Sequence, residues 1–413
     1  MIHPGTTLMQ TVTRPRLSPA GKRGGFSLLE VLIAMFILTV GMLGIAAVVV
    51  IGNMSAMRAL IADRTATVGR NALAEVRVRE WLDPVRWLTV QGAPVVSSRD
   101  QPLPLGEAFC IDPLYIAQIN NQQGAVPNAR SADLGRFPYN PPGTAVSMVR
   151  ISVNIAANPA LPANIQAILM NPQIWQRLVV GEDDLVFDPS RLSRPRLLFR
   201  TDTGAAVPLP TLPGDTASGN PLYADYQGMY SWMVTVVPQV PRIPSGTQKY
   251  LVSAVVFRDR SFLWRDDPTA EVPGERVATA NFLGGGDLRL SIPASLVTDA
   301  AQAEEYLKIP EGQYILLAGR AVISNNPPLM QNVFLWYRVV AAGDVINQNQ
   351  NYFREVTVAG PDWNIAWCLR TNNDTDGDGV PVETQAVLCT NVYGVYTEVI
   401  DPEVLSRSSF PAR

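Results

Sequence analysis

An uncharged run of 27 residues, at positions 31–57, constrains the folding of this chain more than any other feature. It consists mainly of Val, Leu, Ile, Ala and Met, and about 20 such residues let a helix cross a bilayer. A cleaved secretory signal has an apolar core of only about 7–15 residues, so this run is too long for one. Residues 1–25 carry four basic side chains and no acidic one, and positive charge before a span favours the cytoplasmic side. We therefore expect a single pass, with the N-terminus in the cytoplasm and the chain after residue 58 outside it.

One acidic residue, Glu30, stands at the start of the apolar segment. A carboxylate that enters hydrocarbon is costly, so its position needs a reason. Ser27 and Glu30 have the S-x-x-E spacing of a capping box, and an acid in the first turn of a helix interacts favourably with the helix dipole. The residue types alone leave two interpretations open: a helix cap, or a functional carboxylate within an apolar bundle.

The sequence around Glu30 resembles a known processing signal. Residues 25–34 are GFSLLEVLIA, which is similar to the class III signal of type IV prepilins. The resemblance implies that prepilin peptidase cleaves after Gly25 and methylates the new N-terminal residue, Phe26. It also implies that Glu30 pairs with the α-amine of a neighbouring subunit, because a carboxylate buried in a helix bundle is costly unless paired. Residues 41–46, GMLGIA, are most similar to PilV-type minor pilins.

The apolar helix should continue beyond the membrane. Apolar residues recur at near-helical spacing among charged ones over residues 58–83, which predicts an amphipathic continuation. Pro84 is the first strong stop, so we expect the helix to extend from Phe26 to Leu82. The glycines at positions 41, 44 and 52 weaken it by about 1 kcal/mol each relative to alanine. Close helix packing and local unwinding in a stretched filament are equally good explanations for them.

Beyond residue 84 the sequence predicts strands and long loops. Candidate strands rich in Val, Ile, Tyr, Phe and Trp lie at residues 148–155, 197–201, 230–237, 250–258, 275–282, 314–323, 333–341 and 352–358, and the best helix lies at 296–307. We predict an α+β protein: a pilin-like long N-terminal helix packed on antiparallel β-sheet, with an enlarged β-rich C-terminal region. Its expected parts are a leader (1–25), a transmembrane half-helix (26–57), an amphipathic half-helix (58–83) and two β-rich modules (84–200 and 225–413).

The residue inventory argues against an enzyme. The single histidine, His3, lies in the leader, so the mature chain should lack Ser-His, Cys-His and histidine-ligated metal chemistry. We find no phosphate-binding glycine loop and no G-x-S-x-G motif. The inventory does not exclude a catalytic pair of carboxylates that the fold brings together. A net charge of −3 gives no basic surface for nucleic acid.

An acidic segment near the C-terminus resembles the calcium loops of EF-hands and thrombospondin-type repeats. Calcium prefers six to eight oxygen ligands, and this segment places them at alternate positions around glycines. The candidate ligands are Asn372, Asp374, Asp376, Asp378 and Glu383. A second register begins at Asp374 and ends at Gln385, and neither register is flanked by clear helices, which favours a free-standing loop. An acidic Asp-Gly surface turn without metal is the alternative.

Two cysteines bracket this segment. Cys368 and Cys389 lie on either side of it, and the space beyond the inner membrane is oxidising, so we predict a disulfide between them and leave Cys110 free. Closing a loop of about 20 residues contributes about 3 kcal/mol in the chain-entropy model, which would help to hold the acids together.

The prepilin-like signal implies two main functions. The first is a minor pilin of a type IV pilus, anchored in the inner membrane of a Gram-negative bacterium before it joins other pilins in a surface or periplasmic filament. There it would contribute to assembly, priming or tip adhesion. The second is a pseudopilin of a type II secretion system. A membrane-anchored periplasmic enzyme is a lesser alternative, and it predicts no cleavage after Gly25.

Overall fold

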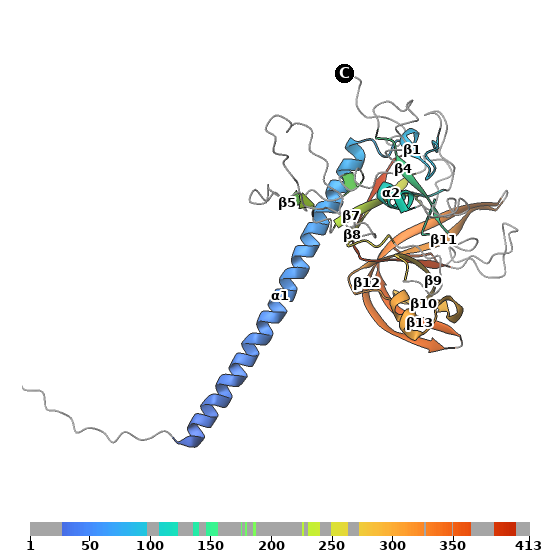
Figure 1. The fold of residues 1–413 in the computed structure, drawn as a ribbon. Helices are drawn as coiled ribbons and strands as arrows, with labels where there is room; N and C mark the ends of the chain where they lie inside the picture. The colour runs from blue at the N-terminus through green and yellow to red at the C-terminus, as the bar shows by residue number, and fades with distance from the viewer. Residues whose placement is uncertain are drawn as a thin grey trace, which may run out of the picture. The chain divides into compact units, whose positions relative to one another are not determined.

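The computed structural model describes residues 27–96, 107–122, 135–139, 146–155, 175, 178–179, 185–186, 225–226, 230–239, 249–262, 272–325, 328–348, 350–364 and 384–401. The chain divides into two compact units, Met1–Leu60 and Ile61–Arg413. The first unit holds the apolar part of the N-terminal helix. The second holds the rest of that helix and all of the described β structure (Figure 1).

Helix α1 (Leu28–Val78) contains the segment that the sequence predicts to cross a membrane. Its most apolar 18-residue window has a mean hydropathy of 2.7, so the helix is long and apolar enough to span a bilayer. As far as Leu60, every described side chain of the helix is exposed, including large apolar ones such as Leu32, Phe36 and Ile45. A helix that is apolar on all sides needs an apolar environment, either lipid or other helices.

Helix α1 ends at Val78, whereas the sequence predicted an end at Leu82. Glu80 has a left-handed backbone conformation with φ of 57°, and the N–H of Trp81 donates to the carbonyl of Val76 over 2.8 Å. These features form a Schellman motif, in which the left-handed position is usually a glycine. The turn brings Trp81 into the core, where it is 1% exposed, and burial of this ring offsets the strain of a left-handed glutamate.

Seven strands of the second unit form one mixed sheet in the order β1-β4-β2-β7-β8-β15, with β3 paired to β4. Their bounds are β1 (Trp87–Leu88), β2 (Phe109–Ile111), β3 (Arg136–Phe137), β4 (Met148–Val153), β7 (Tyr230–Pro238), β8 (Tyr250–Arg258) and β15 (Val392–Ile400). Strands β2 and β4 are parallel, and the other pairs are antiparallel. The strands come from both predicted modules, 84–200 and 225–413, so the two modules share this sheet.

The second β structure is a closed barrel of six antiparallel strands in the order β10-β13-β12-β11-β14-β9. Its strands are β9 (Glu275–Gly284), β10 (Asp287–Pro293), β11 (Tyr314–Asn325), β12 (Pro328–Gln348), β13 (Asn351–Ala359) and β14 (Gln385–Cys389). All of them lie between β8 and β15 in the sequence, so the barrel is an insertion between two neighbouring strands of the sheet. Buried apolar side chains from all six strands pack together with helix α6 (Ala300–Tyr306).

The smaller elements are α2 (Pro113–Gln122), the 3-10 turns at Pro84–Arg86 and Ala294–Leu296, and the strand pair β5 (Leu185–Val186) and β6 (Asp225–Tyr226). The α+β class is confirmed, and seven of the eight predicted strands are present. The eighth, at 197–201, lies outside the described residues. The sequence missed α2, the longer strands β2, β10, β14 and β15, and the two-residue strands β1, β3, β5 and β6. The helix predicted at 296–307 is shorter, because the chain first makes a 3-10 turn.

Both faces of the sheet are buried. One face packs against the end of α1, in a cluster that includes Val68, Leu73, Val76, Val234, Val236, Val252 and Val256. The opposite face packs against the barrel, in a cluster that includes Met233, Val255, Phe257, Leu316, Phe334 and Trp336. All nine residues of β7 are buried as a result. The sheet therefore forms a middle layer between the helix and the inserted barrel.

Gly69 allows α1 to approach β15 closely. A Cβ atom at this position would lie 2.0 Å from the ring of Tyr396, so any other residue must displace the helix or the ring. We expect Gly69→Ala to lower the free energy of unfolding by about 1–3 kcal/mol, although alanine is the better helix former. Chemical unfolding of the purified protein measures the change. Gly52→Ala is the control, since a Cβ there meets no atom within 4 Å, and equal effects of the two substitutions would contradict the close approach.

Candidate functional site

Ser27 caps the N-terminus of α1. The N–H of Leu29 donates to Ser27 Oγ over 3.2 Å, and the N–H groups of Glu30 and Val31 donate to the Ser27 carbonyl over 3.0 and 3.2 Å. A serine hydroxyl that accepts a backbone N–H of the first turn is the preferred way to start a helix. Ser27 therefore caps the helix without the side chain of Glu30.

Glu30 takes no part in this cap. In a capping box its carboxylate would accept the N–H of Ser27, but among the described residues it makes no hydrogen bond or ion pair. Its side chain is exposed, like all its described neighbours on α1. The capping box is therefore not formed, and the role of Glu30 as a partner for a neighbouring amine stays a prediction. The predicted processing residues Gly25 and Phe26 lie outside the described residues.

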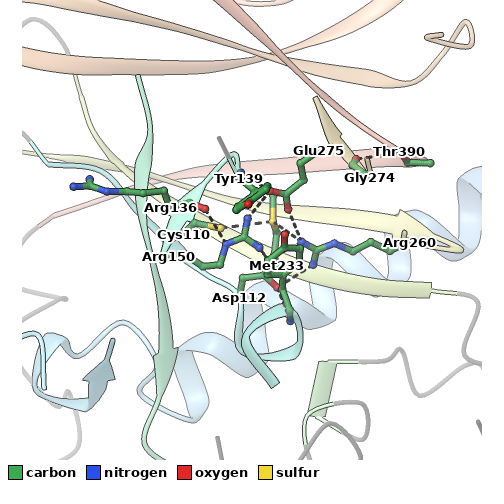
Figure 2. A network of polar contacts seen from close by, with 11 residues as sticks. Cys110, Asp112, Arg136, Tyr139, Arg150, Met233, Arg260, Gly274, Glu275 and Thr390 are labelled. Atoms are coloured by element: carbon green, nitrogen blue, oxygen red, sulfur yellow. Dashed lines mark hydrogen bonds and ion pairs between the residues drawn. The ribbon is translucent and has the colours of Figure 1, made fainter. Parts of the chain in front are cut away.

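Four other charged side chains meet in the interior of the second unit (Figure 2). Asp112 directly follows β2, Arg150 lies on β4, Arg260 lies just beyond β8, and Glu275 begins β9. Arg150 and Asp112 are 0% exposed, Arg260 is 3% exposed and Glu275 is 5% exposed. Two arginines and two acids balance, so the charge of this buried network is zero when all four are ionised.

The two arginines hold both acids. Arg150 Nη1 lies 3.0 Å from Asp112 Oδ2, and its Nη2 lies 2.5 Å from Glu275 Oε2. Arg260 contacts both oxygens of Asp112, at 2.9 and 2.6 Å, and its Nη2 also lies 3.4 Å from Glu275 Oε1. The backbone N–H of Tyr139 donates to Glu275 over 2.9 Å. Two-pronged arginine–carboxylate contacts of this kind are among the strongest and most directional hydrogen bonds in proteins.

Aromatic rings enclose the network. The guanidinium carbon of Arg150 lies 3.5 Å from the ring centroid of Tyr115, and that of Arg260 lies 4.3 Å from the ring centroid of Phe257. A cation over the face of a ring is attracted by its π electrons, most strongly where water is excluded. The rings therefore replace part of the hydration that the guanidinium groups lose on burial.

The network keeps its members charged. Burial alone would raise the pKa of Asp112, but the guanidinium groups of Arg260 and Arg150 hold it below its ordinary value. Burial alone would lower the pKa of Arg150, but the nearby acids, Glu275 foremost, raise it above its ordinary value. Burial also raises the pKa of the neighbouring Cys110 thiol. The Cys110 thiol is therefore held in its neutral form, whereas nucleophilic chemistry uses the thiolate.

Sequence analysis missed this network, although one signal was present. Arg150 is the one charged residue of the strand MVRISV at residues 148–153, and a charge on a buried strand requires a partner. The partners could not be identified in advance, because the fold brings Asp112 and Glu275 to Arg150 from positions 38 and 125 residues away.

The predicted calcium and disulfide sites are only partly within the structure. The loop with Asn372, Asp374, Asp376, Asp378 and Glu383 lies outside the described residues, as does Cys368. Cys389 ends β14 and is buried against the sheet side of the barrel. Cys110 lies on β2 with its Sγ 3.6 Å from Met233 Sδ. The calcium site and the Cys368–Cys389 bridge both stay predictions.

Comparison with known families bears on the N-terminus. Residues 21–46 match the family model of the prokaryotic N-terminal methylation motif. The chain carries a prepilin-type methylation motif. This motif spans Gly25, Phe26 and Glu30, so the resemblance to the class III signal is confirmed, and it supports a type IV pilin-like or pseudopilin substrate of prepilin peptidase. The closer similarity to PilV-type minor pilins stays a prediction. No curated protein and no solved structure matches the chain.

Proposed function

We propose that this protein is a minor pilin of a type IV pilus. The observation that carries the proposal is the methylation motif at residues 21–46, which includes the start of helix α1, together with the described side chains of this helix as far as Leu60, which are all exposed and mostly apolar. Such a helix can lie in a bilayer first and then exchange lipid for the equivalent helices of other pilins. The inserted barrel enlarges the part of the subunit outside the apolar helix, which suits a role in assembly, priming or tip adhesion rather than bulk filament construction.

The proposal includes location and partners. The subunit is first held by a single pass in the inner membrane of a Gram-negative bacterium, with its N-terminus in the cytoplasm. After processing it joins a filament in the periplasm or at the cell surface, and its partners are other pilins. We propose no catalytic role and no nucleic-acid partner.

A pseudopilin of a type II secretion system is the second candidate, since the methylation motif is shared by both kinds of subunit. Neighbouring genes distinguish the two. Other minor pilin genes beside this one would favour the pilus, and genes of a secretion system would favour the pseudopilus.

Processing gives the direct test of either function. Cleavage after Gly25 removes four positive charges and no negative one, which takes the formal net charge from −3 to −7. We expect intact-mass measurement to find a mature chain that begins with N-methylated Phe26 when prepilin peptidase is co-expressed, and the full chain when it is absent. Gly25→Val should block cleavage, whereas Gly24→Ala, one residue away from the scissile bond, should not. A different mature N-terminus would contradict both pilin functions.

We also propose a calcium ion in the loop of residues 372–383. Three alternating aspartates supply more carboxylates than an Asp-Gly turn needs, and calcium selects such oxygen-rich loops. Calcium at about 100 times its dissociation constant would stabilise the protein by about 2.7 kcal/mol, which moves the thermal midpoint by several degrees. We expect a chelator to reverse the rise and Asp374→Asn with Asp376→Asn to abolish it. A midpoint unchanged by calcium in a protein whose Cys368–Cys389 bridge is confirmed by peptide mapping would leave only a surface turn.

A further inference from the structure

The chain crosses between the sheet and the barrel twice, and the two crossings are bonded to each other. The N–H of Thr390 donates to the carbonyl of Gly274 over 2.9 Å, and the N–H of Arg258 donates to the carbonyl of Asn391 over 3.0 Å. We call residues 258–261 and 274–275 of one crossing, with residues 389–391 of the other, the neck. Two segments held side by side at one place connect the barrel to the sheet, but the neck by itself does not oppose rotation about that place.

The buried network lies across this neck. Arg260 and Glu275 belong to the neck itself, while Asp112 and Arg150 belong to the sheet, at the end of β2 and on β4 (Figure 2). Glu275 is the one member that a barrel strand contributes, and it contacts Arg150 at 2.5 Å and Arg260 at 3.4 Å. The network therefore joins the start of the barrel to strands that the neck does not touch.

Apolar packing alone does not account for a single orientation of the barrel. The apolar side chains between sheet and barrel, such as Met233 and Leu316, are buried, but their attraction is non-directional and tolerates sliding. Three neutral hydrogen bonds also cross this contact: from Gln331 Nε2 to the Pro238 carbonyl over 3.0 Å, from Trp336 Nε1 to Thr235 Oγ1 over 3.4 Å, and from the N–H of Val146 to Gln385 over 2.9 Å. They are directional, but breaking them leaves no charge unpaired. Hydrogen bonds between guanidinium and carboxylate groups depend strongly on direction. A rotation of the barrel would break the contacts of Glu275 and leave charges unpaired inside the protein.

The energetics also favour a role in specificity. Four charges are expensive to bury, and their mutual attraction roughly repays the loss of hydration, so a complete network contributes little to net stability. An alternative packing that separates the four side chains would leave charges that are buried but no longer paired, which is strongly unfavourable in free energy. The network thus penalises wrong arrangements more than it stabilises the right one.

We propose that the network of Asp112, Arg150, Arg260 and Glu275 is an orientation lock that fixes the inserted barrel in one orientation on the sheet. Whatever the barrel contacts is then presented at a fixed angle to the sheet on which the end of α1 packs.

The test removes the link while keeping the charges balanced. Arg260→Met combined with Glu275→Leu leaves the neutral Arg150–Asp112 pair intact within the sheet. Leucine is needed at position 275 because Glu275 Oε2 accepts from both Arg150 and Tyr139, so a glutamine could keep the bond to Arg150. Hydrogen exchange of the full chain in detergent micelles, measured by mass spectrometry, then reports where the protein opens. The probes are the amide of Val146, which donates to Gln385 of the barrel over 2.9 Å, and the amide of Thr390 in the neck.

We expect exchange at the two probes to become at least about tenfold faster, while the β7–β8 and β12–β13 pairs change by less than about twofold, because only a local opening is released. The matched control is Arg289→Met with Glu355→Leu. It removes the same two residue types from an ion pair of 2.6 Å on the barrel surface, where the side chains are 42% and 54% exposed. This control should leave hydrogen exchange unchanged at both probes and in both reference strand pairs.

Two results would overturn the proposal. Unchanged exchange at Val146 and Thr390 in the double variant would mean that the packing fixes the barrel without the network. Equal acceleration at the probes and in both reference pairs would mean that the network only adds overall stability. If the double variant does not fold, Glu275→Asp keeps the charge and shortens the side chain. It should produce the same selective pattern in weaker form, and a uniform or absent effect would again overturn the proposal.

Discussion

Replacing Arg150 with methionine should lower the free energy of unfolding by about 3–5 kcal/mol, because it breaks a buried ionic network by removing one partner. Arg150 is 0% exposed and contacts both Asp112 and Glu275. Without it, one arginine faces two buried carboxylates, and one negative charge remains unpaired. Methionine keeps the volume of the arginine stem, so the substitution removes mainly the guanidinium group and its charge.

Chemical unfolding of the full chain in detergent measures this loss, with Arg289→Met as the control. Arg289 also pairs with a glutamate, but it is 42% exposed, and surface ion pairs contribute about 0–1 kcal/mol. Adding Glu275→Gln to Arg150→Met restores neutrality and should recover part of the stability, so the two effects should not add. Equal losses for Arg150→Met and Arg289→Met would show that the network does not depend on its buried charges.

The sign of the pH dependence follows from the same contacts. Asp112 has a pKa below its ordinary value in the folded protein, so its ionised form contributes to the free energy of unfolding. This contribution is complete above the pKa that Asp112 has in the unfolded chain. It is lost as the pH falls through the lower pKa of the folded state. Arg150 is one of the two groups that lower this pKa. Arg150→Met should therefore raise the pKa of Asp112, and the variant should lose stability at a higher pH than the wild-type protein does.

The parts of the fold that sequence analysis predicted are those set by local pattern. Helix α1 follows from the uncharged run after Glu30, the methylation motif follows from residues 25–34, and seven of the strands follow from runs of β-branched and aromatic residues. The end of α1 was missed because the left-handed position is occupied by Glu80 rather than by glycine. Strand β15 was missed because Gly394 interrupts it, and this glycine is needed since a Cβ there would lie 2.5 Å from the side chain of Thr65 on α1.

The parts that could not be predicted depend on distant pairing. Nothing in the local sequence indicates that the strands of residues 275–389 close into a barrel between two neighbouring strands of another sheet. The same holds for the network, since Glu275 reaches Arg150 only after that insertion is complete. Glu30 is the opposite case, because its role was proposed from a local motif. The structure adds that Ser27 caps the helix without it.

Glu30→Ala should leave the protein in the membrane but remove it from the filament. Loss of the carboxylate takes a costly charge out of the apolar segment, so membrane insertion should be unchanged or improved. Incorporation into sheared filaments should fall at least about tenfold, since a tenfold change needs only about 1.4 kcal/mol and leaving one partner of a buried charge pair unpaired costs more than that. Immunoblots of the membrane and sheared-filament fractions, with processing at Gly25 checked by mass, measure both effects.

Ser27→Ala is the matched control for Glu30, because it removes the observed cap and keeps the carboxylate. The loss of a cap costs about 1 kcal/mol of helix stability, which a helix of 51 residues held in lipid or in a bundle tolerates. We therefore expect Ser27→Ala to enter filaments nearly as well as the wild-type protein. If Ser27→Ala and Glu30→Ala lowered incorporation equally, or if Glu30→Ala entered filaments normally, Glu30 would be a residue of the helix start and not the carboxylate that receives a neighbour's amine.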